Sequence, residues 1–259
     1  MTNTNPAHGR DKRIGPADML KLKRWNTPTI YNGWEMISNS ERTSGTINTE
    51  ETRDFMPLLG PMVGRAVTVK IETTNHNNPT LRKSAWDDWL AFVASLPAPK
   101  IVVMQDIDTE PGIGSFWGEV SANMHRSLGC VGAIVDGAIR DVDEMTNAGF
   151  KALARRLCVG HLYAWPVEWG TSVNVFGATV ESGMLMHADK HGFIGIQERD
   201  EPALLAAVRA MDDNECHTVI PAALFTWNKD YSTILDERQQ AASRFRVACA
   251  RIGAVSAEW

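Results

Sequence analysis

Two short apolar runs, with a glycine-rich loop and a helical pattern between them, constrain the fold of this chain more than any other feature. Residues 100–107 and 130–137 are dominated by branched apolar side chains, which is typical of buried strands. Residues 111–118 form the glycine-rich loop, and residues 119–128 have the helical pattern. A strand, a loop, a helix and a second strand in this order predict a fold of the α/β class.

The flanking segments predict further strands in the middle of the chain and helices at both ends. Residues 64–74 alternate in polarity and are rich in β-branched residues, as in a strand, and residues 84–96 gather their large apolar side chains on one helical face. Short strands are expected over residues 150–159, 173–182 and 184–196, and helices over residues 16–37, 201–213 and 234–253.

No repeat or low-complexity linker divides the chain. We therefore expect a single domain over residues 1–259. Its core would span about 60–200, with an N-terminal helical extension at about 16–55 and a C-terminal helical extension at about 200–259.

Composition excludes several classes of protein. The formal net charge is −5, and no basic stripe of the kind that binds nucleic acid is present. The four cysteines lie far apart and form no Cys-x-x-Cys pair, so neither a disulfide framework nor a zinc ribbon is indicated. The N-terminus is polar, and no run of eighteen apolar residues occurs. We expect a cytoplasmic protein that neither enters a membrane nor binds nucleic acid.

The stretch from Asp136 to Glu144 holds four carboxylates around one arginine, and each residue has a structural interpretation. Asp136 and Gly137 form a pair that favours a tight turn. Asp141 and Glu144 have the spacing of a capping box, with Gly149 suited to the helix end. Arg140 would then pair with a neighbouring carboxylate.

A chemical interpretation joins this stretch to the helix expected to begin near Glu119. The free amides of Val120 and Ser121 would point toward the glycine-rich loop and suit a carboxylate or phosphate, although Glu119 could simply stabilise its own helix. If both strand ends meet at one edge of a sheet, the amides and Arg140 would bind the carboxylate of a 2-oxo acid. Asp141 would hold a divalent cation for its keto oxygen.

Two other patterns carry less weight. His187 and His191 are four residues apart, but they lack the adjacent glutamate of zinc proteases and lie between two strand patterns. The glycine-rich loop has its third glycine too late for a dinucleotide fingerprint. Neither pattern predicts a cofactor.

The spacing of Glu119, Arg140 and Asp141, with "GCVGAIVDGAIRD" and the following Glu144, resembles the RraA-like family. The similarity extends over residues 60–200, through "GRAVTV", the glycine-rich loop and "FGATVESGMLMHADKHG". This family includes class II pyruvate aldolases that act on 4-hydroxy-4-methyl-2-oxoglutarate or 4-carboxy-4-hydroxy-2-oxoadipate, and the regulator of ribonuclease E activity. The resemblance implies a swivelling β/β/α sandwich that assembles as trimers or hexamers, with sites between subunits.

The resemblance also implies roles for individual residues. Asp141 would bind Mg²⁺ or Mn²⁺, and Arg140 would bind the pyruvyl carboxylate. Glu119 would order metal-bound water, and Glu144 is a further candidate metal ligand. The remaining substrate contacts would come from Gly118, Val120 and Ser121.

Three departures from the family pattern bear on function. Aldolases usually have aspartate at the position of Glu119, whereas the ribonuclease regulators have glycine. A "PGD" turn of the family is replaced by Ser182, Gly183 and Met184, which removes a carboxylate, and the terminal helices lengthen the chain. A glutamate that a neighbouring subunit donates in the aldolases has no identified counterpart.

We therefore expect a homo-oligomeric, metal-dependent carbon-carbon lyase that releases pyruvate from a 4-hydroxy-2-oxo acid, with oxaloacetate decarboxylase activity as a companion. Cleavage next to a 2-oxo acid leaves a pyruvate enolate, which a divalent cation and Arg140 would stabilise. The alternatives are a non-catalytic regulatory binding protein and a related lyase on another acid. The acidic residue at Glu119 favours an enzyme.

Overall fold

The computed structural model describes residues 13–42, 46–76, 79–224, 226–251 and 254. In this part of the chain, a mixed nine-stranded sheet has the order β1-β6-β5-β3-β2-β10-β11, with β4 paired to β5 and β7 paired to β2. Strands β2, β3, β5 and β6 are parallel. The strands are β1 (Arg53–Asp54), β2 (Met62–Glu72), β3 (Lys100–Asp106), β4 (Ser115–Trp117), β5 (Cys130–Ile139), β6 (Lys151–Leu157), β7 (Trp165–Trp169), β10 (Leu185–Asp189) and β11 (Gly192–Ile196).

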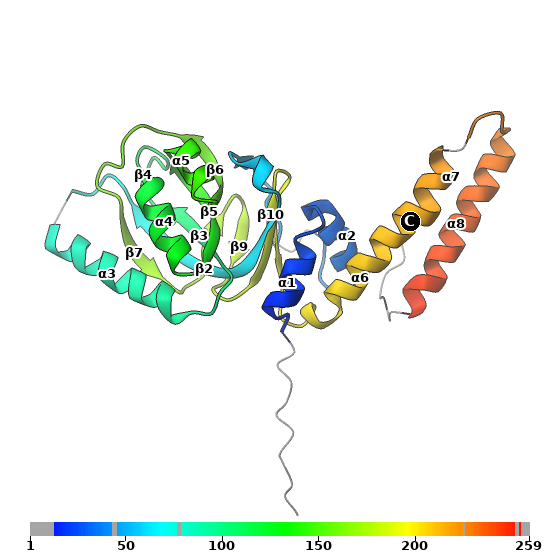
Figure 1. Cartoon of the computed structure of the whole chain (residues 1–259), viewed down its shortest axis with the longest axis horizontal. Coiled ribbons are helices and arrows are strands. Elements are labelled where there is room, and N and C mark those ends of the chain that lie inside the picture. Colours follow the sequence, from blue (N-terminus) through cyan, green and yellow to red (C-terminus); the bar gives the residue numbers. More distant parts are fainter. Residues whose placement is uncertain (1–12, 43–45, 77–78, 225, 252–253, 255–259) are drawn as a thin grey trace, which may run out of the picture.

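Helices cover one face of the parallel strands, and a small hairpin covers the other (Figure 1). The helices on the first face are α3 (Pro79–Ser95), α4 (Glu119–Ser127) and α5 (Val142–Asn147). The opposite face packs against the hairpin of β8 (Val173–Val175) and β9 (Ala178–Val180). Because successive strand residues point to opposite faces, Val102 lies in the helix-side core and Val103 in the hairpin-side core.

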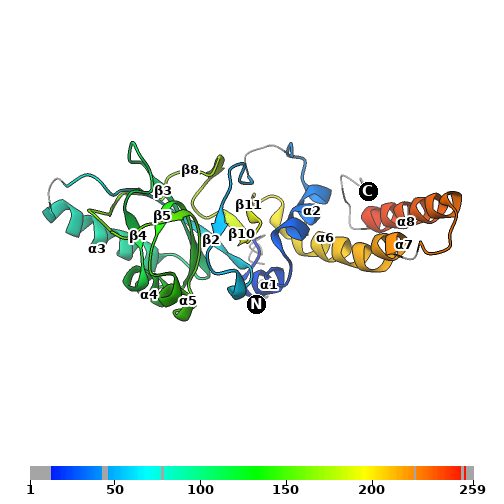
Figure 2. The same ribbon diagram turned by 90° about the horizontal axis from the view of Figure 1, so that it is seen from above.

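Helices from the N-terminal and C-terminal extensions pack together beside the sheet. Helices α1 (Pro16–Leu22) and α2 (Thr27–Ile37) pack with α6 (Glu201–Asn214) against β10 and β11. Beyond α6 the chain continues through a π-helical turn (Glu215–Val219) into α7 (Ile220–Leu224) and returns as α8 (Tyr231–Arg251). Figures 1 and 2 both show α7 and α8 extending away from the sheet as a helical arm. No described helix is both long enough and apolar enough to span a bilayer.

The predicted α/β class is confirmed, and the expected strands and helices form near their predicted bounds. The glycine-rich loop departs from the prediction because its end pairs with β5 as the short strand β4. Helix α3 begins earlier than predicted, at Pro79, and the α7 turn was not predicted. Gly149 has a φ of 66° and follows the last turn of α5, which confirms its predicted place at a helix end.

The predicted turn at Asp136 and Gly137 is wrong. Strand β5 continues through both residues to Ile139, and its register with β6 shifts between Val135 and Ala138. The Asp136 carboxylate pairs with Arg155 and accepts the Phe176 amide at 2.9 Å. These partners hold the chain extended with a bulge where the local sequence favours a turn.

Candidate active site

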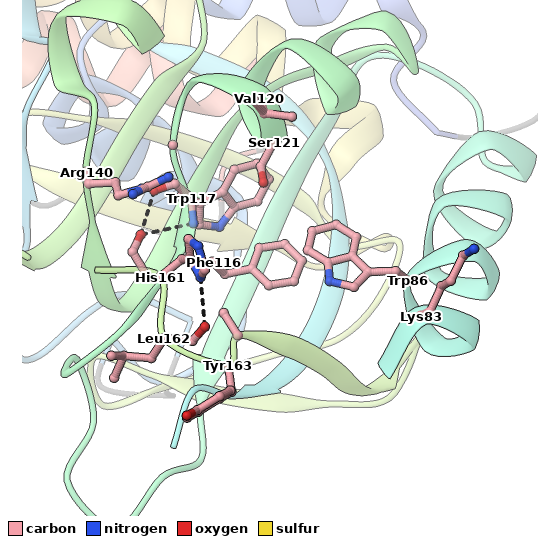
Figure 3. Close-up of a pocket in the computed structure, with 13 residues that line it drawn as sticks. Lys83, Trp86, Phe116, Trp117, Val120, Ser121, Arg140, His161, Leu162 and Tyr163 are labelled. Carbon is pink, nitrogen blue, oxygen red and sulfur yellow. Dashed lines mark hydrogen bonds between the residues drawn. The ribbon is translucent and has the colours of Figure 1, made fainter. Parts of the chain in front are cut away.

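The ends of β4 and β5 open into a pocket of about 460 Å³ (Figure 3). It is bounded by the start of α4, by one side of α3 and by the loop that precedes β7. The lining residues are Lys83, Trp86, Ser115, Phe116, Trp117, Gly118, Val120, Ser121, Arg140, His161, Leu162, Tyr163 and Ala164. Among them are four of the residues expected to bind substrate, namely Gly118, Val120, Ser121 and Arg140.

Arg140 is fixed at the pocket by its main chain and is loosely held at its side chain. Its amide donates to the Trp117 carbonyl at 3.1 Å, which continues the pairing of β4 with β5. Its guanidinium lies 3.6 Å from the Asp141 carboxylate through Nε and 3.5 Å from the Val159 carbonyl through one terminal nitrogen. The fork therefore keeps donors for a ligand in the pocket, where a carboxylate can bind in a bidentate manner.

Asp141 caps a helix, but the helix is not its own. The residue has a φ of 53° and a ψ of 48°, a left-handed conformation that aspartate tolerates better than most residues. Its Oδ2 accepts the amide of Glu119 at 3.1 Å, at the start of α4. No side-chain cap forms on α5, so the predicted capping box of Asp141 with Glu144 is wrong. The carboxylate thus lies between the start of α4 and Arg140, and Asp141 itself is not among the residues that line the pocket.

Gly118 makes this approach possible. A Cβ atom built at Gly118 would lie 2.5 Å from Asp141 Oδ2 and 3.2 Å from Arg140 Nε. Its backbone is extended, so the requirement for glycine is one of space and not of dihedral angle. Gly118, the third glycine of the loop, thus lets Arg140 and Asp141 pack directly against the start of α4.

The first turn of α4 presents free donors to the pocket. Gly118 has no side chain to cap the helix, and Asp141 satisfies only the Glu119 amide. Among the described residues, the amides of Val120 and Ser121 have no acceptor. These amides and the Arg140 guanidinium lie around one pocket, so the predicted pairing of a helix start with an arginine is present geometrically.

The remaining predicted site residues lie outside the pocket lining. The Glu119 side chain is exposed at the start of α4, and the Glu144 side chain is exposed on the first turn of α5. No group of three or more potential metal ligands occurs among the described residues. Asp141 Oδ1, however, has no hydrogen-bond partner in the described chain, and one or two carboxylates together with water and substrate oxygens suffice for Mg²⁺. The free oxygen of Asp141 therefore fits a hard divalent cation. Glu119 is the neighbouring acidic residue, since its amide bonds the other oxygen of Asp141.

Sequence reasoning missed one side of the pocket. Lys83 and Trp86 come from α3, with the Trp86 ring stacked on Phe116 at 4.5 Å between centroids. His161 and Tyr163 come from the loop before β7, where His161 Nδ1 lies 2.7 Å from the Leu162 carbonyl. A helical pattern predicts which residues share a face of α3. It does not predict that the N-terminal end of α3 packs near a loop about eighty residues further along the chain.

The histidine pair behaves as its sequence context suggests. His187 is buried on β10, where its Nδ1 lies 2.9 Å from the Thr27 hydroxyl, and burial lowers its pKa to about 4. His191 lies in the β10–β11 turn and pairs with Asp189 at 3.0 Å. The two rings contact different partners and do not converge.

Comparisons with known proteins show the family and the fold of this chain. A family model described as RraA-like, Aldolase/RraA, matches residues 27–194. An uncharacterized protein of Methanocaldococcus jannaschii is 24% identical over 157 residues, which are 59% of this chain and 68% of that protein.

Two solved structures share the fold. An uncharacterized protein from Pseudomonas syringae pv. tomato aligns with a TM-score of 0.66 and 15% identity, covering 92% of this chain and 100% of that one. A Streptomyces coelicolor protein, described as an unusual member of the RNase ES inhibitor RraA protein family, aligns with a TM-score of 0.59 and 18% identity, covering 79% of this chain and 94% of that one.

The span matched by the family model contains the whole pocket, from Lys83 to Ala164. The family covers both aldolases and RraA-type inhibitors of ribonuclease E. This chain belongs to the RraA-like family.

Proposed function

We propose that this protein is a divalent-metal-dependent pyruvate lyase, which cleaves a 4-hydroxy-2-oxo acid to pyruvate and also decarboxylates oxaloacetate. The observation that carries the proposal is the convergence of Arg140 and the free amides of Val120 and Ser121 around one pocket, with the Asp141 carboxylate directly behind them, against Arg140 and the Glu119 amide. A carboxylate clamp next to a cation ligand is what the retro-aldol cleavage of a 2-oxo acid needs.

The residues of the chain divide the work of this reaction. Arg140 and the amides of Val120 and Ser121 bind the carboxylate of the substrate and fix the orientation of its keto group. As the C3–C4 bond breaks, negative charge develops on the enolate of pyruvate, which the Arg140 guanidinium in the pocket lining would stabilise.

Asp141, with Glu119 nearby, would hold Mg²⁺ or Mn²⁺. The bound ion would supply Lewis-acid polarisation of the keto oxygen. The Glu119 side chain is exposed at the start of α4, where its carboxylate would accept the proton of the 4-hydroxyl group and a proton from solvent would then reach C3 of the enolate.

A regulatory binding role is the second candidate. The Streptomyces coelicolor neighbour is described as a member of the RNase ES inhibitor RraA protein family, which supports this candidate. A binding protein would use the pocket, or the surface around it, without turnover.

Coupled pyruvate release separates these candidates. Oxaloacetate and a panel of 4-hydroxy-2-oxo acids are incubated with the enzyme and Mg²⁺, with enzyme and excess chelator, and with Mg²⁺ alone to subtract spontaneous decarboxylation. We expect turnover only with enzyme and metal together. Arg140→Lys keeps the positive charge but loses the planar fork, so KM should rise markedly. Full turnover in chelator would refute the metal assignment, and no turnover on any acid would favour the regulatory role.

A further inference from the structure

A buried chain of hydrogen bonds connects α3 to the first turn of α4 beneath the pocket. The indole Nε1–H of Trp89 donates to His125 Nε2 at 2.9 Å. His125 Nδ1 in turn lies 2.7 Å from the carbonyl of Ser121. Both rings are fully buried, in a cluster that also contains Phe116 and Trp117.

The chemistry of the partners fixes the proton on His125. Indole nitrogen is only a donor, so Nε2 of His125 must be the acceptor. The proton of the neutral ring is therefore on Nδ1, which donates to the Ser121 carbonyl. Burial lowers the pKa of His125 to about 4, so the ring is neutral near pH 7.

The Ser121 carbonyl is a sensitive place to attach such a chain. Ser121 lies in the first turn of α4, and its amide and that of Val120 border the pocket. Helix starts fray readily when they lack a local cap, and Gly118 supplies none. Asp141 anchors this turn from the strand side through the Glu119 amide, and His125 anchors it from the core side.

We propose that His125, oriented by Trp89, is a positioning residue that holds the first turn of α4 so that its free amides face the substrate carboxylate. The binding part of this inference rests on the proposed function. The same helix α3 carries Trp86 and Lys83 to the pocket, so the chain of hydrogen bonds also ties that wall to the amides.

The test uses variants that break the chain at different links. Trp89→Phe keeps a large ring but removes the donor to Nε2. His125→Leu removes both bonds, whereas His125→Asn places an amide near the Nδ1 position and can still donate to the carbonyl four residues earlier. Val93→Ala, one turn along α3 and equally buried, is the matched control because an aliphatic side chain takes no part in the chain of hydrogen bonds.

We expect Trp89→Phe and His125→Leu to raise KM, and the Kd of pyruvate with Mg²⁺, by about threefold to tenfold, with kcat changed by less than about twofold. His125→Asn should recover most of this loss. Val93→Ala should lower the thermal midpoint without changing KM or Kd. Unchanged binding in both Trp89→Phe and His125→Leu, or equal weakening in Val93→Ala, overturns the proposal.

Two readouts do not depend on turnover. The ¹⁵N shifts of His125 should report a proton on Nδ1 in the parent protein and a changed tautomer population in Trp89→Phe. Exchange of the Ala122 amide, which bonds the Gly118 carbonyl at 2.9 Å, should accelerate in Trp89→Phe and His125→Leu but not in His125→Asn. If the parent protein neither binds nor releases pyruvate, the proposed function fails, and the Ala122 exchange rates alone decide whether His125 positions the turn.

Discussion

Asp141 performs two tasks with one carboxylate: Oδ2 accepts the Glu119 amide, and Oδ1 remains available. Asp141→Asn keeps an oxygen for the amide and a residue that tolerates the left-handed conformation. We therefore expect the thermal midpoint to change little, while the apparent affinity for Mg²⁺ falls by at least about tenfold and pyruvate release falls with it. Calorimetry and metal titration of turnover check both parts. Near-normal turnover at saturating Mg²⁺ would mean that Asp141 is structural.

Gly118 offers a second prediction at the same scale. In Gly118→Ala the new methyl group would meet Asp141 Oδ2 at 2.5 Å, so the carboxylate or the start of α4 must move. We expect kcat/KM to fall by about 100-fold or more. Gly160→Ala is the control, since its Cβ would only meet Leu162 atoms at 3.6 and 3.9 Å. Steady-state kinetics of both variants decide the matter, and equal losses would contradict a specific role for Gly118.

The sequence predicted the part of this site whose residues are close in the chain or share a recognisable spacing. Arg140 and the amides after Gly118 line the pocket as expected. The capping box failed because Asp141 finds a better partner on another element, 22 residues away, than within α5. Local preference describes what a residue can do nearby, and tertiary contacts decide which option it takes.

At the scale of elements, the bulge in β5 lies just before Arg140 and therefore affects the position of Arg140 at the end of this strand. The Asp136 carboxylate stabilises this bulge through its contacts with Arg155 and with the Phe176 amide. Phe176 itself has a left-handed backbone, with a φ of 49°. Asp136→Ala leaves the Phe176 amide without its acceptor and leaves the guanidinium with Glu50 alone. We expect a loss of about 1–3 kcal/mol in the free energy of unfolding, measured by urea denaturation. Glu50→Ala, which removes only the more exposed partner of Arg155, should cost less than about 0.5 kcal/mol. Equal losses would contradict the role of the bulge.

The elements themselves were largely predictable, because each strand and helix has its own periodic pattern. The sequence did not predict how these elements pack together. Helix α3 places Lys83 and Trp86 beside the loop that holds His161 and Tyr163. The apolar face of α3 indicated burial of Trp89, but not its hydrogen bond to His125 on α4. Such contacts join segments dozens of residues apart, for which one sequence contains no local signal.

For the whole molecule, two buried histidines link stability to pH. Burial lowers the pKa of both His125 and His187 to about 4, below the value of 6.5 in the unfolded chain. The unfolded state therefore binds more protons below pH 6.5, and stability is lost as pH falls from 6.5 toward 4, by up to about 3 kcal/mol for each residue. Asp106 acts in the opposite sense, because burial raises its pKa to about 6.

The variant His187→Asn tests this linkage. Its amide can replace Nδ1 beside the Thr27 hydroxyl but does not titrate. We expect the variant to be less stable than the parent protein at pH 7.5 and to lose less of its thermal midpoint between pH 7 and pH 5. Parallel pH profiles for the two proteins would show that His187 does not contribute.

The surface around the pocket predicts an assembly. Val159 is 94% exposed beside Arg140, and Val120, Leu162 and Tyr163 are 72%, 42% and 47% exposed at the same rim. An exposed apolar rim around a pocket suits a neighbouring copy of the chain that covers it.

We therefore expect a homo-oligomer, a trimer or a hexamer, in light scattering at micromolar concentration. Val159→Asp places a charge in this rim, so it should shift the protein toward monomer and reduce pyruvate release, while circular dichroism remains unchanged. Leu58→Asp is the control, because Leu58 is 98% exposed on the 3₁₀ turn Pro57–Leu59, outside the pocket rim, and should leave assembly and activity intact. Because the new carboxylate lies near Arg140, turnover per chain is compared across protein concentrations, and turnover that follows the fraction of oligomer in both proteins would indicate that the site needs a second chain. A fully active monomer would instead mean that the exposed apolar rim serves another partner or the substrate itself.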